Sequence, residues 1–298
     1  MQKDNIYDCI IIGAGPGGLQ AAIHLARFNR SVLLVDRGGG RTSKGRHIVN
    51  YLGIPAIDGL ELTRIGFLQG RSFGVTVKSR TTVTSLSKHR FFKAKISKEE
   101  FIGRYAIAAS GARDILPPIK NLESFFGKGF FTCVDCDGHL TTDTELVVIG
   151  NNPNAARLAL AMKKMYTDRL TLLADNFSLP PEYLDLLMAE RITVIKGSPA
   201  TLQGQERLTG LTLADGRMVL CQTIMASYGW QLNDQFLAGL ALKRDAGNFK
   251  ILTSPSGETS VRGLFVTGAL RSGHTQSIIA AGQGATAAIE INSRLLSL

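Results

Sequence analysis

Residues 7–18 read Tyr-Asp-Cys-Ile-Ile-Ile-Gly-Ala-Gly-Pro-Gly-Gly, and this stretch decides the fold. The apolar run is typical of a buried parallel strand, and a glycine-rich turn follows it directly. Residues 19–26 then predict a helix, and a second apolar run at 31–35 ends in Asp36. Strand, Gly-x-Gly-x-x-Gly, helix, strand and acid in this order predict the first βαβ unit of a dinucleotide-binding Rossmann domain.

The residues of this turn have separate physical roles. Gly13 permits the tight turn, Gly15 lets the backbone approach a pyrophosphate, and Gly18 lets the helix and the strand pack closely. The helix that starts near Pro16 offers free N–H groups and a positive dipole end to the phosphates. Asp36 can accept a hydrogen bond from a ribose hydroxyl. We therefore predict that these five residues bind a dinucleotide.

A second unit of the same order begins near Glu145. Residues 146–173 predict a strand, a turn, a helix and a strand, and Asp175 follows. The turn is less suited to a dinucleotide than the first because it contains Asn151 and Asn152. The Cβ of Asn152 hinders the approach of a pyrophosphate. An exposed Asp175 would oppose a 2′-phosphate and suit a free ribose hydroxyl. Two interpretations stay open: a second nucleotide held by these three residues, or a vestigial Rossmann layer that binds nothing.

The remaining segments complete the predicted architecture. Residues 41–68 predict an irregular segment, and residues 74–101 predict an antiparallel meander. A strand at 264–267 and a helix at 277–296 are expected to close the first domain. The sequence thus predicts an α/β fold with two Rossmann-like domains of the FAD/NAD(P)-binding type, the second inserted in the first. The predicted bounds are 1–113 and 232–298 for the FAD-binding domain and 114–231 for the nicotinamide-type domain.

The charge of the chain limits its partners. Its 298 residues include 34 Lys and Arg against 24 Asp and Glu, a formal net charge of +10. This balance favours an acidic protein, an anionic membrane surface, nucleic acid or a phosphate-rich cofactor. Because no basic run of five to eight residues occurs, we expect no nucleic-acid partner. No stretch is apolar enough to cross a bilayer, and no signal peptide is evident, so we expect a cytoplasmic protein, with a peripheral membrane position as the alternative.

Two of the four cysteines form a Cys-x-x-Cys pair, Cys133 and Cys136. A structural zinc site needs four ligands, and the isolated Cys9 and Cys221 supply no second pair, so we expect no metal. A redox dithiol needs only two sulfurs close enough to bond, and the alternative is a chance spacing of structural cysteines. Asp137 can relay a proton when the disulfide opens. We predict Cys133, Cys136 and Asp137 as the catalytic residues.

Taken together, four stretches resemble motifs of low-molecular-weight thioredoxin reductase and its flavoprotein relatives: 13–18, 109–112, 133–138 and 276–287. The resemblance covers nearly the whole chain. It implies a homodimer that binds FAD and exchanges electrons with a thioredoxin-like protein or a small dithiol. It also implies that Cys136 faces the flavin, that Cys133 exchanges with the partner, and that Asp137 is the acid–base group.

The resemblance extends to the flavin contacts. Gln276 and the helix start at Ser277 would hold the pyrimidine edge of the isoalloxazine, where N–H groups favour the anionic reduced flavin. Tyr228 and Trp230 have two interpretations, stacking on a flavin or packing in an interdomain core, and His274 has a flavin role or a surface role. The full set of predicted FAD contacts is Gly13, Gly15, Pro16, Gly18, Asp36, Arg37, Asn50, Ala109, Gly111, Gly268, Gln276 and Ser277.

Two departures from the family pattern concern the cofactors. The His-Arg-Arg stretch that grips the NADPH phosphate is absent, since residues 174–176 read Ala-Asp-Asn. Each lost arginine contact is worth roughly 1.5–3 kcal/mol, so two losses weaken affinity about 10²-fold or more. The family's Gly-Asp beside the ribityl chain is Gly268-Ala269 here, which removes one hydrogen bond to FAD. We therefore predict that NADPH is not the usual donor.

The family includes branches that do not use pyridine nucleotides. The sequence most resembles the diflavin-linked disulfide oxidoreductases, in which a second FAD occupies the nicotinamide-type domain. The alternatives are an NADPH-dependent thioredoxin reductase, a ferredoxin-dependent thioredoxin reductase that meets an acidic electron-transfer protein, a dithiol oxidase that passes electrons to oxygen, and a non-catalytic flavoprotein.

Overall fold

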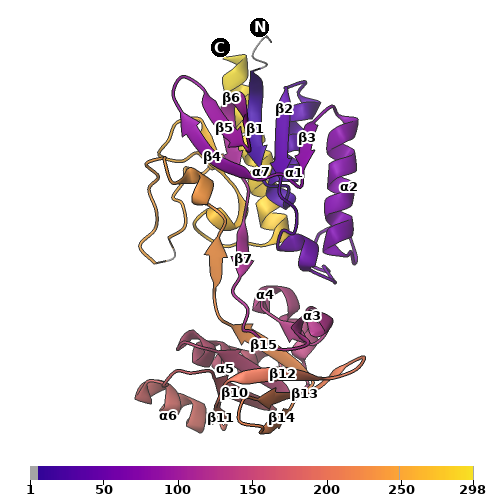
Figure 1. Ribbon diagram of the computed structural model, residues 1–298, viewed down its shortest axis with the longest axis vertical. Coiled ribbons are helices and arrows are strands. Elements are labelled where there is room, and N and C mark those ends of the chain that lie inside the picture. Colours follow the sequence, from indigo (N-terminus) through magenta and orange to yellow (C-terminus); the bar gives the residue numbers. More distant parts are fainter. Residues whose placement is uncertain (1–5, 248, 298) are drawn as a thin grey trace. The chain divides into compact units, whose positions relative to one another are not determined.

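The computed structural model describes residues 6–247 and 249–297. The chain divides into two compact units: Met1–Arg113 with Gln231–Leu298, and Asp114–Trp230. In Figure 1 the indigo N-terminal and yellow C-terminal segments belong to the same unit. The predicted α/β fold of Rossmann-like units is confirmed. The predicted binding role of each domain stays a prediction at this point.

The first unit is built on one sheet with the strand order β3-β2-β1-β6-β5-β4, and β17 pairs with β6. Its parallel part contains β1 (Tyr7–Ile12), β2 (Val32–Asp36), β3 (Thr76–Ser79), β17 (Leu264–Val266) and the later residues of β6 (Glu99–Ala108). Its antiparallel part contains β4 (Val83–Lys88), β5 (Phe92–Ile96) and the earlier residues of β6. The short strands β7 (Ala112–Asp114) and β16 (Trp230–Leu232) pair with each other.

Small residues bring two helices of this unit together, α1 (Pro16–Arg27) and α7 (Ser277–Leu296). A Cβ added at Gly284 would lie 2.1 Å from the carbonyl oxygen of Gly17, so only glycine permits this approach. Ala287 and Ala288 are fully buried in the same cluster as Ile11 of β1. The C-terminal helix therefore closes the first unit, and its bounds agree with the predicted 277–296.

One prediction in this unit is wrong, and another is right only in part. Residues 41–68 include a 3₁₀ turn, η1 (Thr42–Lys44), and most of a helix, α2 (Gly59–Ser72). The oxygen Oδ1 of Asp58 accepts a hydrogen bond from the N–H of Leu60 at 2.8 Å and caps this helix. The predicted meander at 74–101 begins with β3, which is a parallel neighbour of β2 rather than a meander strand. Only β4, β5 and β6 run antiparallel there.

The second unit holds a parallel sheet and a smaller antiparallel one. The parallel order β11-β10-β9-β15-β8 uses β8 (Phe130–Phe131), β9 (Leu146–Gly150), β10 (Leu170–Ala174), β11 (Thr193–Lys196) and β15 (Thr223–Ser227). The antiparallel strands are β12 (Pro199–Gly204), β13 (Leu208–Leu213) and β14 (Met218–Leu220). The helices are α3 (Leu122–Phe125), α4 (Val134–Asp137), α5 (Asn154–Met165) and α6 (Pro181–Ala189), with the 3₁₀ turn η2 (Gly138–Thr141) after α4. The helices of residues 6–247 and 249–297 are too short or too polar to cross a bilayer.

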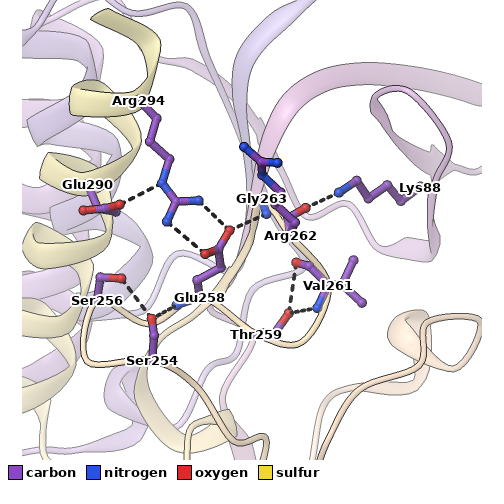
Figure 2. A network of polar contacts seen from close by, with 10 residues as sticks. All are labelled: Lys88, Ser254, Ser256, Glu258, Thr259, Val261, Arg262, Gly263, Glu290 and Arg294. Atoms are coloured by element: carbon purple, nitrogen blue, oxygen red, sulfur yellow. Dashed lines mark hydrogen bonds and ion pairs between the residues drawn. The ribbon is translucent and has the colours of Figure 1, made fainter. Parts of the chain in front are cut away.

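A polar network ties the end of α7 to the loop before β17 (Figure 2). Both guanidinium nitrogens of Arg294 donate to the Glu258 carboxylate, at 2.6 and 2.9 Å, and its Nε donates to Glu290 at 2.7 Å. The backbone N–H of Gly263 donates to the same Glu258 carboxylate at 2.7 Å. Lys88 Nζ donates to the carbonyl oxygen of Arg262. The hydrogen bonds from Arg294 lower the pKa of Glu258 below its usual value of 4.5.

Replacing Arg294 by Met should destabilise the first unit. The change leaves the half-buried Glu258 carboxylate without its bidentate partner, so we expect a loss of about 2 kcal/mol in the free energy of unfolding. Because the pKa of Glu258 is lowered in the folded state, its contribution is present above about pH 4.5 and is lost as the pH falls below it. Urea unfolding at pH 7 and pH 4 measures both effects, and the variant should lose less stability on acidification than the wild type.

The matched control is Arg64→Met, which breaks the exposed Glu61–Arg64 pair within α2. An exposed pair contributes little, so this change should leave the free energy of unfolding close to that of the wild type. Equal losses for both variants would show that the Glu258 network is not a special stabilising contact.

Candidate functional site

The glycine turn between β1 and α1 combines close packing with one open position. Gly13 has a φ of +103°, and a Cβ added there would lie 2.4 Å from the carbonyl oxygen of Ala109. A Cβ added at Gly18 would lie 1.9 Å from the carbonyl oxygen of Gly13. A Cβ added at Gly15 would meet nothing within 4 Å. Gly13 and Gly18 are therefore required for packing, whereas Gly15 leaves room for a ligand to approach the backbone.

The start of α1 offers unpaired donors beside that room. No side chain caps this helix, and Pro16 has no N–H. The N–H groups of Gly17 and Gly18 are buried and make no hydrogen bond within the described part of the chain. Buried donors without a partner are costly, and at a helix start they fit an anion such as a pyrophosphate. The turn therefore fits the phosphates of FAD.

Asp36 lies at the edge of the same turn. Its carboxylate accepts from the N–H of Ala14 at 2.9 Å and from the N–H of Gly38 at 2.8 Å. Ala14 lies between Gly13 and Gly15, so the carboxylate is held next to the turn. A carboxylate fixed there can also accept from a ribose hydroxyl.

The other predicted FAD contacts all lie in the first unit, and the structure brings several of them together. Asn50 Nδ2 donates to Gln276 Oε1 at 3.2 Å, and Gln276 directly precedes Ser277, the first residue of α7. Arg37 donates to Asn233 Oδ1 at 3.0 Å. The remaining positions are these: Ala109 N–H donates to Ile12 O at 2.8 Å, Gly111 has a φ of +67°, and Gly268 N–H donates to Gln283 Oε1 at 2.7 Å. That these residues contact FAD stays a prediction.

The structure adds two residues that the sequence analysis missed. Thr267, at the end of β17, is 1% exposed, and its Oγ1 has no hydrogen-bond partner in the described chain. This hydroxyl lies beside Gly17, whose added Cβ would be 2.5 Å away. Asn233 accepts from Ser110 Oγ through its carbonyl oxygen at 2.6 Å, besides its bond with Arg37. Thr267 directly precedes Gly268 and could have been noticed, whereas no motif marks Asn233.

The dithiol lies at the start of α4 in the second unit. Cys133 and Cys136 form a disulfide, with their Cα atoms 5.3 Å apart. The N–H groups of Cys136 and Asp137 donate to the carbonyl oxygen of Cys133 at 3.3 and 3.0 Å, which closes one helical turn around the pair. A Cβ at Gly138 would lie 2.7 Å from the Tyr166 ring, which explains the glycine after Asp137. Asp137 is therefore held one residue from Cys136 at the end of the turn.

The other two cysteines, Cys9 and Cys221, have unreactive thiols. Cys9 is fully buried in β1, and burial raises the pKa of its thiol far above the usual value. Burial also raises the pKa of Cys221 to about 12. Only thiolates react readily, so neither thiol is a nucleophile at neutral pH. Among the described residues, no group of His, Cys, Asp and Glu is arranged to hold a metal ion.

The second glycine turn is filled by side chains of the protein itself. Asn152 Oδ1 accepts from the N–H of Asn154 at 3.0 Å, and Asn152 Nδ2 donates to Asn151 Oδ1 at 3.0 Å. Asp175 is buried rather than exposed as predicted, because it packs beneath Tyr228, whose hydroxyl donates to Asp175 Oδ2 at 2.7 Å. Tyr228 itself lies in the core of the second unit. Trp230 is half-buried, whereas His274 in the loop before α7 is exposed.

Known proteins resemble the chain over almost its full length. Residues 7–285 match the family described as pyridine nucleotide-disulphide oxidoreductase. The thioredoxin reductase of Aquifex aeolicus is 28% identical over 308 residues, which cover 99% of this chain and 95% of that protein. The crystal structure of HlmI is 28% identical with a TM-score of 0.90 and covers 100% of this chain and 95% of that one. The thioredoxin reductase of Giardia duodenalis is 25% identical with a TM-score of 0.85, covering 98% and 99%.

Replacing Gly15 by Val should separate binding from folding. The new side chain meets open space, so the melting temperature of the FAD-free protein should change by no more than about 2 °C. Its bulk blocks the backbone, so FAD affinity in a fluorescence titration should fall roughly tenfold or more. Gly18→Ala is the contrast, since its Cβ would collide with Gly13 O and destabilise the fold itself. Unchanged FAD affinity in Gly15→Val would contradict this site.

Thiol labelling should distinguish the two kinds of cysteine. With a maleimide reagent under native conditions, the oxidised protein should label at no cysteine and the reduced protein at Cys133 and Cys136 only. Denaturation after reduction should expose all four thiols. Mass spectrometry of the labelled chain gives the count. Native labelling of Cys9 or Cys221 would show that their burial does not protect them.

Proposed function

Since the chain belongs to the pyridine nucleotide-disulphide oxidoreductase family, we propose that it exchanges two electrons between FAD and the Cys133–Cys136 pair, without NADPH as its usual donor. At the level of the family, the prediction of a flavin-dependent disulfide oxidoreductase is confirmed. The observation that carries the finer proposal is the Cys133–Cys136 disulfide, in a chain whose other two cysteines are buried and unreactive.

The first glycine turn supports FAD as the cofactor. Gly15 and the unpaired N–H groups of Gly17 and Gly18 would hold the pyrophosphate, and Asp36 would accept from the ribose. Gln276 and Ser277 would hold the pyrimidine edge of the flavin. When bound, FAD supplies the two-electron acceptor or donor that the cysteine pair needs.

The chain's own residues carry out the thiol chemistry. A thiolate of the partner attacks Cys133 Sγ, the Cys133–Cys136 bond breaks, and Cys136 leaves as a thiolate. Asp137 exchanges a proton with Cys136 Sγ. The partner's second thiolate then attacks the mixed disulfide, so the partner leaves oxidised, and Cys133 and Cys136 hold the two electrons. The reverse sequence reduces a disulfide of the partner.

The partner is proposed from chemistry and from the relatives. Relatives named thioredoxin reductase support a thioredoxin-like protein or a small dithiol at Cys133. The net charge of +10 supports an acidic electron-transfer protein or an anionic membrane surface as a further contact. A homodimer stays a prediction that follows from the family resemblance.

The prediction that NADPH is not the usual donor follows from the residues after β10. Arginines that could pair with a 2′-phosphate are missing there, and the buried carboxylate of Asp175 would repel one. Two alternatives stay open for this unit: a second FAD, as in the diflavin branch, or a vestigial layer that binds nothing. The atom that bears on this choice is Asp175 Oδ1, which is buried and has no hydrogen-bond partner in the described part of the chain; a ribose hydroxyl could bond with Asp175 only where its buried contact with Tyr228 opens.

Cys136→Ser tests the electron route. The variant should retain FAD, but its flavin should no longer be bleached by an added dithiol under anaerobic conditions, because no disulfide remains to be opened. The matched control is Cys221→Ala, which removes a buried thiol from the core and should keep dithiol bleaching close to that of the wild type. Full bleaching in Cys136→Ser would overturn the assignment of the cysteine pair.

The same absorbance assay tests the donor. Micromolar NADPH added to the anaerobic wild type should leave the flavin oxidised. Rapid bleaching by NADPH would instead support an ordinary NADPH-dependent thioredoxin reductase. Heat-released FAD counted per chain tests the second flavin: a ratio of two would support the diflavin branch.

A further inference from the structure

The second unit carries its own side chains at the place where a Rossmann layer binds a dinucleotide. This place is the carboxyl edge of the parallel strands, where β9 has β10 on one side and β15 on the other. Asn152 follows β9, Asp175 follows β10, and Tyr228 follows β15. We propose that these three residues close the second unit to dinucleotides, so that Asn152 and Tyr228 determine which electron donors the protein excludes. The inference rests on the proposed function, whose independence from NADPH it explains.

Asn152 occupies the position that Gly15 leaves open in the first unit. The two turns correspond residue by residue, from Gly13 and Gly150 to Pro16 and Pro153. A Cβ at Gly15 meets nothing within 4 Å, whereas Asn152 extends a whole side chain from the same point. That side chain is fixed, since its Nδ2 donates to Ser227 O at 3.4 Å as well as to Asn151.

The first three N–H groups of α5 all have acceptors within the described chain. The N–H of Asn154 donates to Asn152 Oδ1 at 3.0 Å. The N–H groups of Ala155 and Ala156 donate to the carbonyl oxygens of Asn152 and Pro153, each at 3.1 Å. In α1, the N–H groups of Gly17 and Gly18 are unpaired within the described chain. A pyrophosphate at α5 would therefore have to break bonds that the chain already makes, whereas at α1 it would satisfy free donors.

The Tyr228 hydroxyl bonds with the carboxylate that a ribose hydroxyl would otherwise use. In a Rossmann site, the acid after the second strand accepts from a ribose hydroxyl. Here the Tyr228 hydroxyl donates to Asp175 Oδ2 at 2.7 Å, and both residues are only 9% exposed. Burial and the contact with Asp175 raise the pKa of Tyr228 far above its usual value, so the phenol remains a donor at physiological pH. The other oxygen, Asp175 Oδ1, is buried and has no hydrogen-bond partner among the described residues, so the Tyr228 hydroxyl occupies this carboxylate where a ribose hydroxyl would bind.

Opening the site tests the inference. In the double variant Asn152→Gly with Tyr228→Phe, the N–H of Asn154 and the Asp175 carboxylate lose the side-chain partners that they have in the wild type. We use NADH as the probe, because its free ribose hydroxyl suits Asp175. Equilibrium dialysis of the FAD-loaded proteins should show at least tenfold tighter NADH binding by the double variant than by the wild type. NADPH should gain less, since Asp175 repels its 2′-phosphate.

Matched controls come from the same unit. Asn121→Gly removes an asparagine at a φ of +64° that bonds with Leu202 O, and Tyr183→Phe removes a hydroxyl on α6 that bonds with Arg157, so neither change removes a partner of Asn154 or Asp175. Neither should gain NADH binding. If the double variant unfolds, Asn152→Gly alone is measured, since it leaves the buried Tyr228–Asp175 pair intact and should still bind NADH several-fold more tightly than the wild type.

Different results would contradict the closed site and the proposed function. A folded variant with unchanged FAD content and no gain in NADH binding would overturn the closed site and leave the proposed function standing. Tight NADPH binding by the wild type, with prompt bleaching of its flavin, would overturn the proposed function and the closed site together. Two FAD per wild-type chain would overturn the closed site and support the diflavin branch instead.

Discussion

The contact on which the first unit depends is the approach of Gly18 to Gly13, where an added Cβ would lie 1.9 Å from a carbonyl oxygen. This approach fixes how the chain turns from β1 into α1. Gly284 of α7 packs against the same turn, since a Cβ added there would lie 2.1 Å from the carbonyl oxygen of Gly17. The N-terminal strand and the C-terminal helix are thereby packed around one glycine turn, and α7 begins at Ser277, next to the pair formed by Asn50 and Gln276.

The second unit keeps the first packing glycine of this turn, as Gly150, but has Ala155 at the position of Gly18 and Asn152 at the open position. A Cβ at Gly150 would lie 2.7 Å from both Ala155 Cβ and Ser227 O, so glycine is still required there. The position of Gly15 is taken by Asn152, whose side chain bonds with the helix start. Packing and ligand approach are therefore separate demands on different glycines. A Rossmann layer can retain its fold after its phosphate site has been filled by its own side chains.

The four cysteines divide in the same way between packing and chemistry. Cys9 and Cys221 lie in two cores, where burial raises the pKa of each thiol and leaves it a small hydrophobic residue. Cys133 and Cys136 lie on a single helical turn, half-buried, with Asp137 directly after them. The disulfide needs only local geometry, since one turn brings the two Cα atoms to 5.3 Å.

The sequence by itself determined what depends on neighbours along the chain: the first glycine turn, the Cys-x-x-Cys pair, the α/β class and the bounds of α7. It missed α2, whose side chains Leu60, Ile65 and Leu68 are exposed and leave no clear apolar stripe, although Asp58 and Glu61 have capping-box spacing. Only the tertiary structure decided that Asp175 is buried, because its partner Tyr228 is 53 residues away. The same holds for Glu258 and Arg294, 36 residues apart. Local sequence patterns indicate the period of a helix or strand and the positions where only a small residue fits. Pairs such as these depend instead on which strands and helices pack together.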